Sequence, residues 1–132
     1  MKLVTFQFED GRRHIGALRP GEVEAVDLTA SGHAAFADML ALMDGGAGAL
    51  DLAHDVLAKG ADVVPLSRVH LLSPVPEPRS LIDCITFEEH MMNAGRFVHV
   101  VTNSEPLVDK SRGMPPIYRE LPIYYKGNRF SV

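Results

Sequence analysis

The chain of 132 residues is long enough for one compact domain, or for a small domain and part of a second. Hydrophobic residues make up 46% of it and charged residues 23%, a globular composition that argues against wholesale disorder. The formal net charge is -4, and neither half of the chain is basic, which excludes a nucleic-acid-binding surface of clustered Lys and Arg.

The single cysteine, Cys84, cannot form an intramolecular disulfide, which fits a reducing compartment. The sequence has no run of about 18 apolar residues, and it begins directly with a strand pattern rather than a signal peptide. We therefore expect a soluble cytoplasmic protein without membrane contact.

Three antiparallel strands are predicted within residues 3–28. Apolar and polar residues alternate with a period of two, and Asp10-Gly11 and Pro20-Gly21 supply the turns between the strands. A strand-like stretch also runs from Pro65 to Leu72.

Two helices, over 33–44 and 49–59, are predicted to form a hairpin beside this sheet. The first follows Ser31 as a possible N-cap, ends at Gly45-Gly46, and has Phe36, Met39, Leu40 and Met43 at helical spacing. The second has a stripe of Leu52, Ala53, Val56 and Leu57, and Gly60 follows its C-terminus.

The run of alternating prolines from Pro74 to Pro78 favours an extended segment and marks a domain boundary. We therefore predict a small N-terminal domain over 1–73 and a second domain over 74–132. The second part contains a predicted strand over 81–85, a helix that begins at 87–93, a polar loop over 103–116, and a strand from Leu121 into a Gly-Asn turn. It has no closing element, so we expect the second domain to be incomplete.

The pattern most suggestive of chemistry is an acid, Asp83, at a strand end, followed seven residues later by His90 in a short helix. This spacing can place a hard oxygen ligand and a general base over one pocket. The spacing alone is weak evidence, because most acids and histidines of globular proteins are surface residues.

The wider pattern resembles the fumarylacetoacetate hydrolase family. It consists of Asp-x6-His-x2-Asn-x-Gly, preceded by Pro-x-Pro-x-Pro and followed by Leu-Pro-x-x-Tyr-x-Gly, over residues 72–132. The resemblance implies an α+β fold in which a small antiparallel sheet with a helical hairpin precedes the beginning of a β-rich catalytic domain.

The resemblance also implies a role for each matching residue. Asp83 corresponds to a ligand of a divalent ion, Mg²⁺, Ca²⁺ or Mn²⁺, and His90 corresponds to the base that activates water. The implied reaction is hydrolysis of a C–C bond in a β-diketo or 2-oxo acid such as an acylpyruvate, during catabolism, by a homodimeric enzyme. Isomerase and decarboxylase activities remain open, since they share the same enolate chemistry.

The residues implied to contact substrate match the family motif to different degrees. Tyr125 matches the family tyrosine whose hydroxyl contacts substrate, and Tyr124, on the other strand face, is expected to pack. Lys126 either meets a substrate carboxylate or lies in solvent. Arg96 is a candidate for binding the carboxylate of the substrate, although it is displaced by several positions from the family arginine. Asn93 stands where some members have a glutamate that orients the histidine, so this chain is nearer to members acting on larger diketo acids.

Several residues are expected to have no part in the site. Cys84 is expected in a core on the strand face opposite Asp83, and Glu88 and Glu89 are expected in solvent. A thiol nucleophile or a zinc site would need further Cys or His partners at suitable spacing. The remaining histidines lack such partners in the sequence: His14, His33, His54, His70 and His99.

The remaining metal ligands of the family, in a Glu-x-Glu segment and a further Asp, would lie beyond residue 132. One carboxylate and a histidine cannot hold Mg²⁺ well, so we expect the 132-residue chain alone to be inactive. Two functions are compatible with this expectation: the front part of a metal-dependent enzyme, or a non-catalytic docking or dimerisation module with a vestigial half-site.

Overall fold

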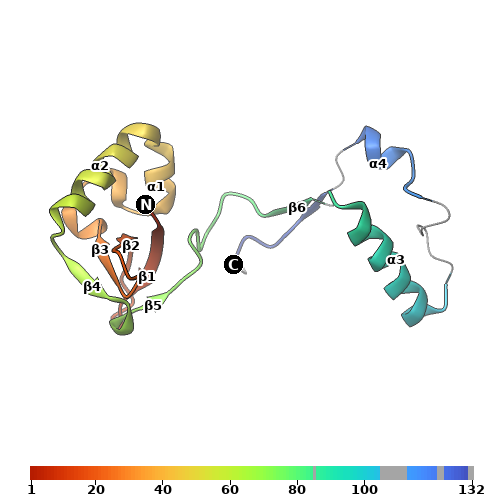
Figure 1. Ribbon diagram of the computed structural model, residues 1–132, viewed down its shortest axis with the longest axis horizontal. Coiled ribbons are helices and arrows are strands. Elements are labelled where there is room, and N and C mark those ends of the chain that lie inside the picture. The colour runs from red at the N-terminus through yellow and green to blue at the C-terminus, as the bar shows by residue number, and fades with distance from the viewer. Residues whose placement is uncertain (85, 105–112, 122–123, 131–132) are drawn as a thin grey trace. The chain divides into compact units, whose positions relative to one another are not determined.

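The computed structural model describes residues 1–84, 86–104, 113–121 and 124–130 (Figure 1). Contacts divide the chain into two compact units, residues 1–78 together with Phe130, and residues 79–129. The division follows the proline run, whereas the sequence placed it between residues 73 and 74. Most of the predicted loop over 103–116 lies outside the described residues, as do residue 85 and residues 122–123 of the two predicted strands.

The first unit is an α+β structure built on a curled antiparallel sheet of five strands (Figure 1). The strands are β1 (Leu3–Gln7), β2 (Arg13–Leu18), β3 (Glu24–Asp27), β4 (Val63–Pro65) and β5 (His70–Leu71). Their order in the sheet is β4-β3-β2-β1-β5. The helices are α1 (Met39–Asp44) and α2 (Gly46–Lys59), with 3-10 turns at η1 (Thr29–Ser31), η2 (Ala34–Phe36) and η3 (Leu66–Arg68). The three predicted antiparallel strands are confirmed as β1, β2 and β3.

The predicted continuous stretch from Pro65 to Leu72 is wrong. The turn η3 breaks it, so that β4 pairs with β3 at one edge of the sheet and β5 pairs with β1 at the other. Strands of three and two residues are too short to show a period in the sequence. Their shortness, with Pro65 in β4, limits pairing with another chain at either edge.

The turn between β1 and β2 is closed by Asp10. One oxygen of its carboxylate accepts a hydrogen bond from the Arg12 amide at 3.0 Å, and the other accepts from Arg12 Nε at 2.8 Å. The backbone hydrogen bond, and after it the guanidinium, lower the pKa of Asp10. The Arg12 guanidinium also lies 5.2 Å from the centre of the Phe8 ring.

The predicted first helix over 33–44 is divided in two. Asp38 is extended, with φ -157° and ψ 179°, and its side chain accepts a hydrogen bond from the Ala41 amide at 2.8 Å. Asp38, rather than Ser31, is therefore the N-cap, and α1 begins only at Met39. The next helix, α2, begins three residues earlier than predicted, at Gly46, and its predicted end at Lys59 is confirmed by Gly60 in the left-handed conformation.

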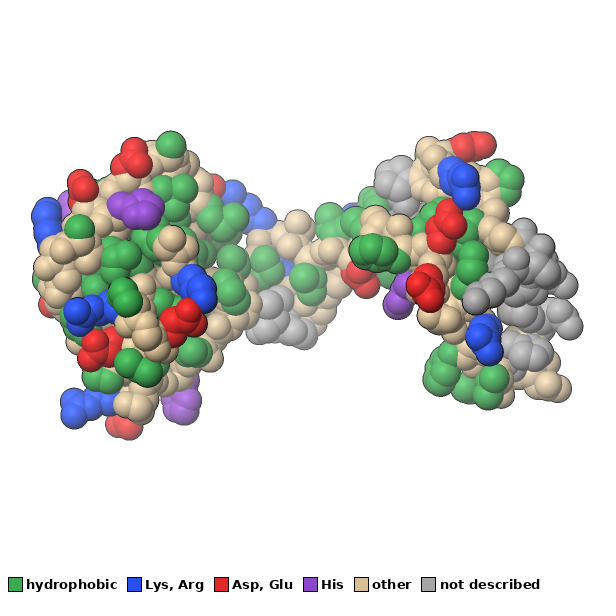
Figure 2. Space-filling view, in the orientation of Figure 1, with side chains coloured by type: hydrophobic (Ala, Val, Ile, Leu, Met, Phe, Trp, Pro, Cys, Tyr) green, Lys and Arg blue, Asp and Glu red, His purple; other side chains and the backbone are tan. Residues whose placement is uncertain are grey.

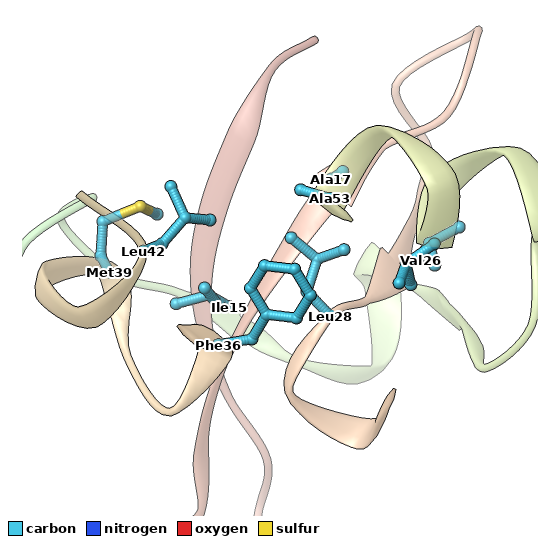
Figure 3. Close-up of a cluster of buried hydrophobic side chains, with 9 residues drawn as sticks. Ile15, Ala17, Val26, Leu28, Phe36, Met39, Leu42 and Ala53 are labelled. Atoms are coloured by element: carbon cyan, nitrogen blue, oxygen red, sulfur yellow. The ribbon is translucent and has the colours of Figure 1, made fainter. Parts of the chain in front are cut away.

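The core of the first unit lies between one face of the sheet and the helices (Figure 3). Its buried members are Ile15, Ala17, Val26, Leu28, Phe36, Met39, Leu42, Ala53 and Val56. The predicted stripe of α2 is confirmed, but Met43 is 60% exposed and Leu42 takes its place in the core. The late start of α1 shifts the phase of the helix, which explains the exchange.

A polar pair, made by the half-buried His14 and the buried Asp27, joins β2 to β3 on the opposite face of the sheet. Asp27 lies directly opposite Gly16, and His14 is the diagonal neighbour on the same face. The Asp27 carboxylate, 4% exposed, lies 2.6 Å from His14 Nδ1, and its other oxygen accepts a hydrogen bond from the Ala30 amide at 3.0 Å. The His14 ring packs edge-on against Phe8, with centroids 5.1 Å apart. The sequence alone gave no sign of this partner for His14.

The second unit contains two short strands and two helices: β6 (Ile82–Cys84), α3 (Glu88–Thr102), α4 (Ile117–Glu120) and β7 (Tyr124–Lys126). The helix α3 extends well beyond the predicted Phe87–Asn93, and it ends where Asn103 takes a positive φ of 53°. None of the residues of this unit whose burial is described is buried. Among the described residues of the whole chain, no helix is long and apolar enough to cross a membrane.

We expect replacement of His14 by Ala to lower the free energy of unfolding of the first unit by about 2–3 kcal/mol. The change removes a hydrogen bond to a buried carboxylate and an edge-on aromatic contact. Urea titration followed by NMR of core amides of this unit measures the effect. Replacement of the exposed His54 by Ala is the matched control and should change stability by less than about 0.5 kcal/mol. Equal effects of the two changes would contradict a stabilising His14–Asp27 pair.

Gly16 offers a second test, because its neighbours leave no room for a side chain. A Cβ at this position would meet the Val26 carbonyl oxygen at 2.8 Å and the Phe6 ring at 3.0 Å. We expect replacement of Gly16 by Ala to cost about 1–3 kcal/mol, because backbone and ring must shift apart. Replacement of Gly48 by Ala, within α2 and with no atom within 4 Å of the new Cβ, should instead stabilise by up to about 1 kcal/mol. The same urea titration measures both variants, and a neutral Gly16 variant would contradict the tight packing.

Candidate active site

The antiparallel ribbon of β6 and β7 brings two parts of the sequence motif together. Asp83 in β6 is the direct cross-strand partner of Tyr125 in β7. Directly opposed residues of an antiparallel pair project from the same face, with Cβ atoms about 4.5–5.5 Å apart. The candidate metal ligand and the candidate substrate-binding tyrosine therefore share one face of the ribbon, although the loop and both helices separate them in sequence.

The other face of the ribbon carries the neighbouring side chains. Cys84 lies opposite Tyr124, and Ile82 lies opposite Lys126. Because neighbours along a strand alternate between faces, Lys126 projects away from the face of Asp83 and Tyr125. The pairing thus separates Tyr125 from Lys126, which the sequence had treated as joint candidates.

The expectation that Cys84 lies in a core is wrong, since the residue is exposed as a free thiol. Tyr124, expected to pack, is 49% exposed. The ribbon has two strands, and each described residue of β6 and β7 is exposed, so neither face of the ribbon has a covering layer among the described residues. Alternation correctly placed Cys84 and Asp83 on opposite faces, but it could not indicate whether either face is covered.

His90 lies in the first turn of α3, which begins shortly after β6. The Thr86 amide donates a hydrogen bond to the Cys84 carbonyl oxygen at 3.0 Å, shortly before the helix begins. His90 is exposed. Glu88, expected in solvent, forms an ion pair of 2.9 Å with Arg119 of α4, so it joins the start of α3 to the next helix.

His90 belongs to an apolar, exposed stripe of α3. His90, Phe97 and Val101 lie on one side of the helix at offsets of seven and four residues. Phe97 is 69% exposed and Val101 is 64% exposed, and Figure 2 shows apolar side chains at the surface of this unit. Arg96 lies about 120° around the helix from His90, at 3.6 residues per turn. The helix therefore does not bring Arg96 and His90 to the same face.

Asp83 fits a divalent metal by the type of its ligand atom, since Mg²⁺, Ca²⁺ and Mn²⁺ all bind carboxylate oxygens. The number of ligands does not suffice, because the described residues contain no group of three or more His, Cys, Asp or Glu side chains that could hold an ion. A metal site at Asp83 would thus need further oxygen ligands from outside the described part of the chain.

Tyr118 is a polar residue that the sequence did not indicate. Its hydroxyl in α4 is buried and has no hydrogen-bond partner among the described residues. Such a hydroxyl costs about 1–3 kcal/mol when it stays unpaired, so its position marks a place where a further polar group would stabilise the unit. Tyr118 lies outside the segments that make up the sequence motif, so no local pattern indicated it.

Comparisons with known proteins add no assignment: no model of a protein family, no curated protein and no solved structure matches this chain.

Proposed function

We propose that the chain supplies the front part of a metal-dependent hydrolase of the fumarylacetoacetate hydrolase type, which cleaves a C–C bond of a β-diketo or 2-oxo acid. The observation that carries this proposal is the register of the ribbon, which pairs Asp83 with Tyr125. Two residues that the motif assigns to one site thereby project from one face, and His90 follows in the helix that begins after β6.

In this proposal each residue acts through its own chemistry. The Asp83 carboxylate is an oxygen ligand, the Tyr125 hydroxyl donates a hydrogen bond to a substrate oxygen, and the His90 imidazole accepts a proton from water. A divalent ion would supply Lewis acidity toward the substrate carbonyl when bound. The geometry gives Lys126 and Arg96 less support as carboxylate-binding residues, because they project from other faces than Asp83 and His90.

The proposed site is incomplete within the chain. Mg²⁺ needs near-octahedral oxygen coordination, and one carboxylate supplies a single position or two. The proposal therefore includes further carboxylates from outside the 132 residues, and an active form that is a cytoplasmic homodimer. Hydrolysis, isomerisation and decarboxylation all require the same activation of a carbonyl, so the choice of reaction would be made by the substrate pocket.

A second candidate function is a non-catalytic docking or dimerisation module. It is favoured by the distribution of burial, because the first unit has its own core whereas the second unit has no buried residue among those whose burial is described. In this case Asp83 and His90 would be remnants of a site, and the first unit would be the functional part.

A Mn²⁺ titration of the 132-residue chain tests the proposed ligand. Because Mn²⁺ broadens NMR signals of nearby nuclei, we expect weak binding with preferential broadening of the Asp83 and Tyr125 amides. Replacement of Asp83 by Asn should remove this preference, since a neutral amide is a poorer ligand for a hard cation. Replacement of Glu120, an exposed carboxylate in α4, by Gln is the matched control. Broadening that is equal at Glu120 and Asp83 would count against the ligand role.

The downstream sequence separates the two candidate functions. We expect a reading frame that continues past codon 132 to encode a Glu-x-Glu segment and a further Asp; a stop codon there would favour the docking module.

The role of His90 is tested in a longer form of the protein. In that form, His90→Ala should lower Mg²⁺-dependent acylpyruvate cleavage by about 10²–10⁴-fold, because a general base contributes about that much. Metal affinity should stay unchanged, and His54→Ala should leave both quantities unaltered. Normal turnover of the His90 variant would contradict the assignment of His90 as the general base.

A further inference from the structure

The first unit contains a cavity of about 240 Å³ between the sheet, the start of α1 and the proline segment. Its lining residues come from these three elements: Thr5, Arg13, His14 and Ile15 of the sheet, Ala37, Asp38, Met39 and Leu40 around the start of α1, and Val75, Pro76 and Glu77 of the proline segment. This volume is well above the roughly 10–15 Å³ that one water molecule needs on the same measure, so the cavity has room for a small organic molecule. The cavity belongs to residues 1–78 and does not involve Asp83 or His90.

Hydrogen bonds and an ion pair hold the walls in place. The Thr5 hydroxyl donates to the Pro74 carbonyl oxygen at 2.6 Å, and the Leu72 amide donates to the Thr5 carbonyl oxygen at 2.9 Å. Arg13 forms an ion pair of 2.9 Å with Glu77 across the rim. These contacts tie the proline segment to β1 and β2, so the cavity exists without a ligand, as is usual for small-molecule sites.

The floor of the cavity is apolar and its rim carries an excess of negative charge. Ile15 is 1% exposed and Met39 is 6% exposed, and Val75 packs against the same core. At the rim, the charge of Arg13 is offset by its partner Glu77, whereas Asp38 has no cationic partner in the described part of the chain. One oxygen of Asp38 caps α1, and the other is left for a ligand.

We propose that this cavity binds a small organic cation with a compact apolar body and a primary ammonium group. The body would be buried against Ile15, Met39 and Val75, and the ammonium would lie at the Asp38 carboxylate. An anion of the same shape would meet Asp38 as an uncompensated like charge, and a neutral molecule would gain the apolar contact alone. The inference goes beyond the proposed hydrolase function and is independent of the metal site.

An NMR titration of the 132-residue chain tests the proposal with three probes of similar shape: phenethylammonium, 2-phenylethanol and 3-phenylpropionate. We expect phenethylammonium to shift the amides of Ala37, Leu40 and Val75, with an affinity roughly twofold to fivefold above that of the alcohol. The propionate should bind more weakly than the alcohol. Absence of shifts at these amides with phenethylammonium at millimolar concentration would overturn the proposal, as would equal affinity for amine and alcohol.

Two variants show whether the rim selects the charge. Asn caps a helix as well as Asp, so Asp38→Asn removes the charge while α1 keeps its N-cap. With Glu77→Gln in addition, Arg13 becomes the remaining charge of the rim, and the preference should change from phenethylammonium to 3-phenylpropionate. Asp51→Asn, an exposed position of α2 away from the cavity, should leave the preference unchanged. Retained preference for the amine in the double variant would contradict the assignment, and circular dichroism confirms that each variant is folded.

Discussion

The first unit depends on one constraint: its sheet has two faces, and two short helices can cover one of them. The helices and Phe36 bury the face that carries Ile15 and Val26. The other face is closed by the curl of the sheet itself, in which Phe6, fully buried, lies against Gly16. A curl of this kind needs a glycine where the ring crosses a neighbouring strand, and it leaves polar groups inside that must satisfy one another. His14 and Asp27 do so, and they also fix the turn after β3.

The second unit is held by different forces, because none of the residues whose burial is described there is buried. The pairing of β6 with β7 is extended by a hydrogen bond of 2.9 Å from the Gly127 amide to the Leu81 carbonyl oxygen. The ion pair between Glu88 and Arg119 is exposed, and such pairs contribute about 1 kcal/mol at most. The candidate site therefore rests on a backbone ladder rather than on packing, and its geometry is specified by strand register.

Sequence periodicity predicted those elements whose pattern is local. The strands β1–β3 and the stripe of α2 follow from periods of two and 3.6 residues, and Gly60 follows from the geometry of a helix end. Three features depend on contacts that no local pattern encodes. The capping hydrogen bond of Asp38 determines where α1 begins, and so which of its residues are buried. His14 contacts Asp27 diagonally across two paired strands. The turn η3 separates β4 from β5, which lie at opposite edges of the sheet. For the candidate site, the motif resemblance suggested Asp83, His90 and Tyr125, but the pairing of Asp83 with Tyr125 depends on a register set across a long connection.

The solvent exposure of the second unit affects both its stability and the chemistry proposed for it. A base and a metal ligand surrounded by water act in a high dielectric, where charge stabilisation is weak, whereas a covered site strengthens each electrostatic contact. The stripe of Phe97 and Val101 lies on the same side of α3 as His90, so a layer that buries these apolar side chains would also exclude water from the imidazole. If the further carboxylates of the proposed site belong to that layer, the surface that covers the second unit would also complete the proposed metal site. Covering of the unit and assembly of the proposed site would then be one event, whereas the register of the ladder already aligns Asp83 with Tyr125.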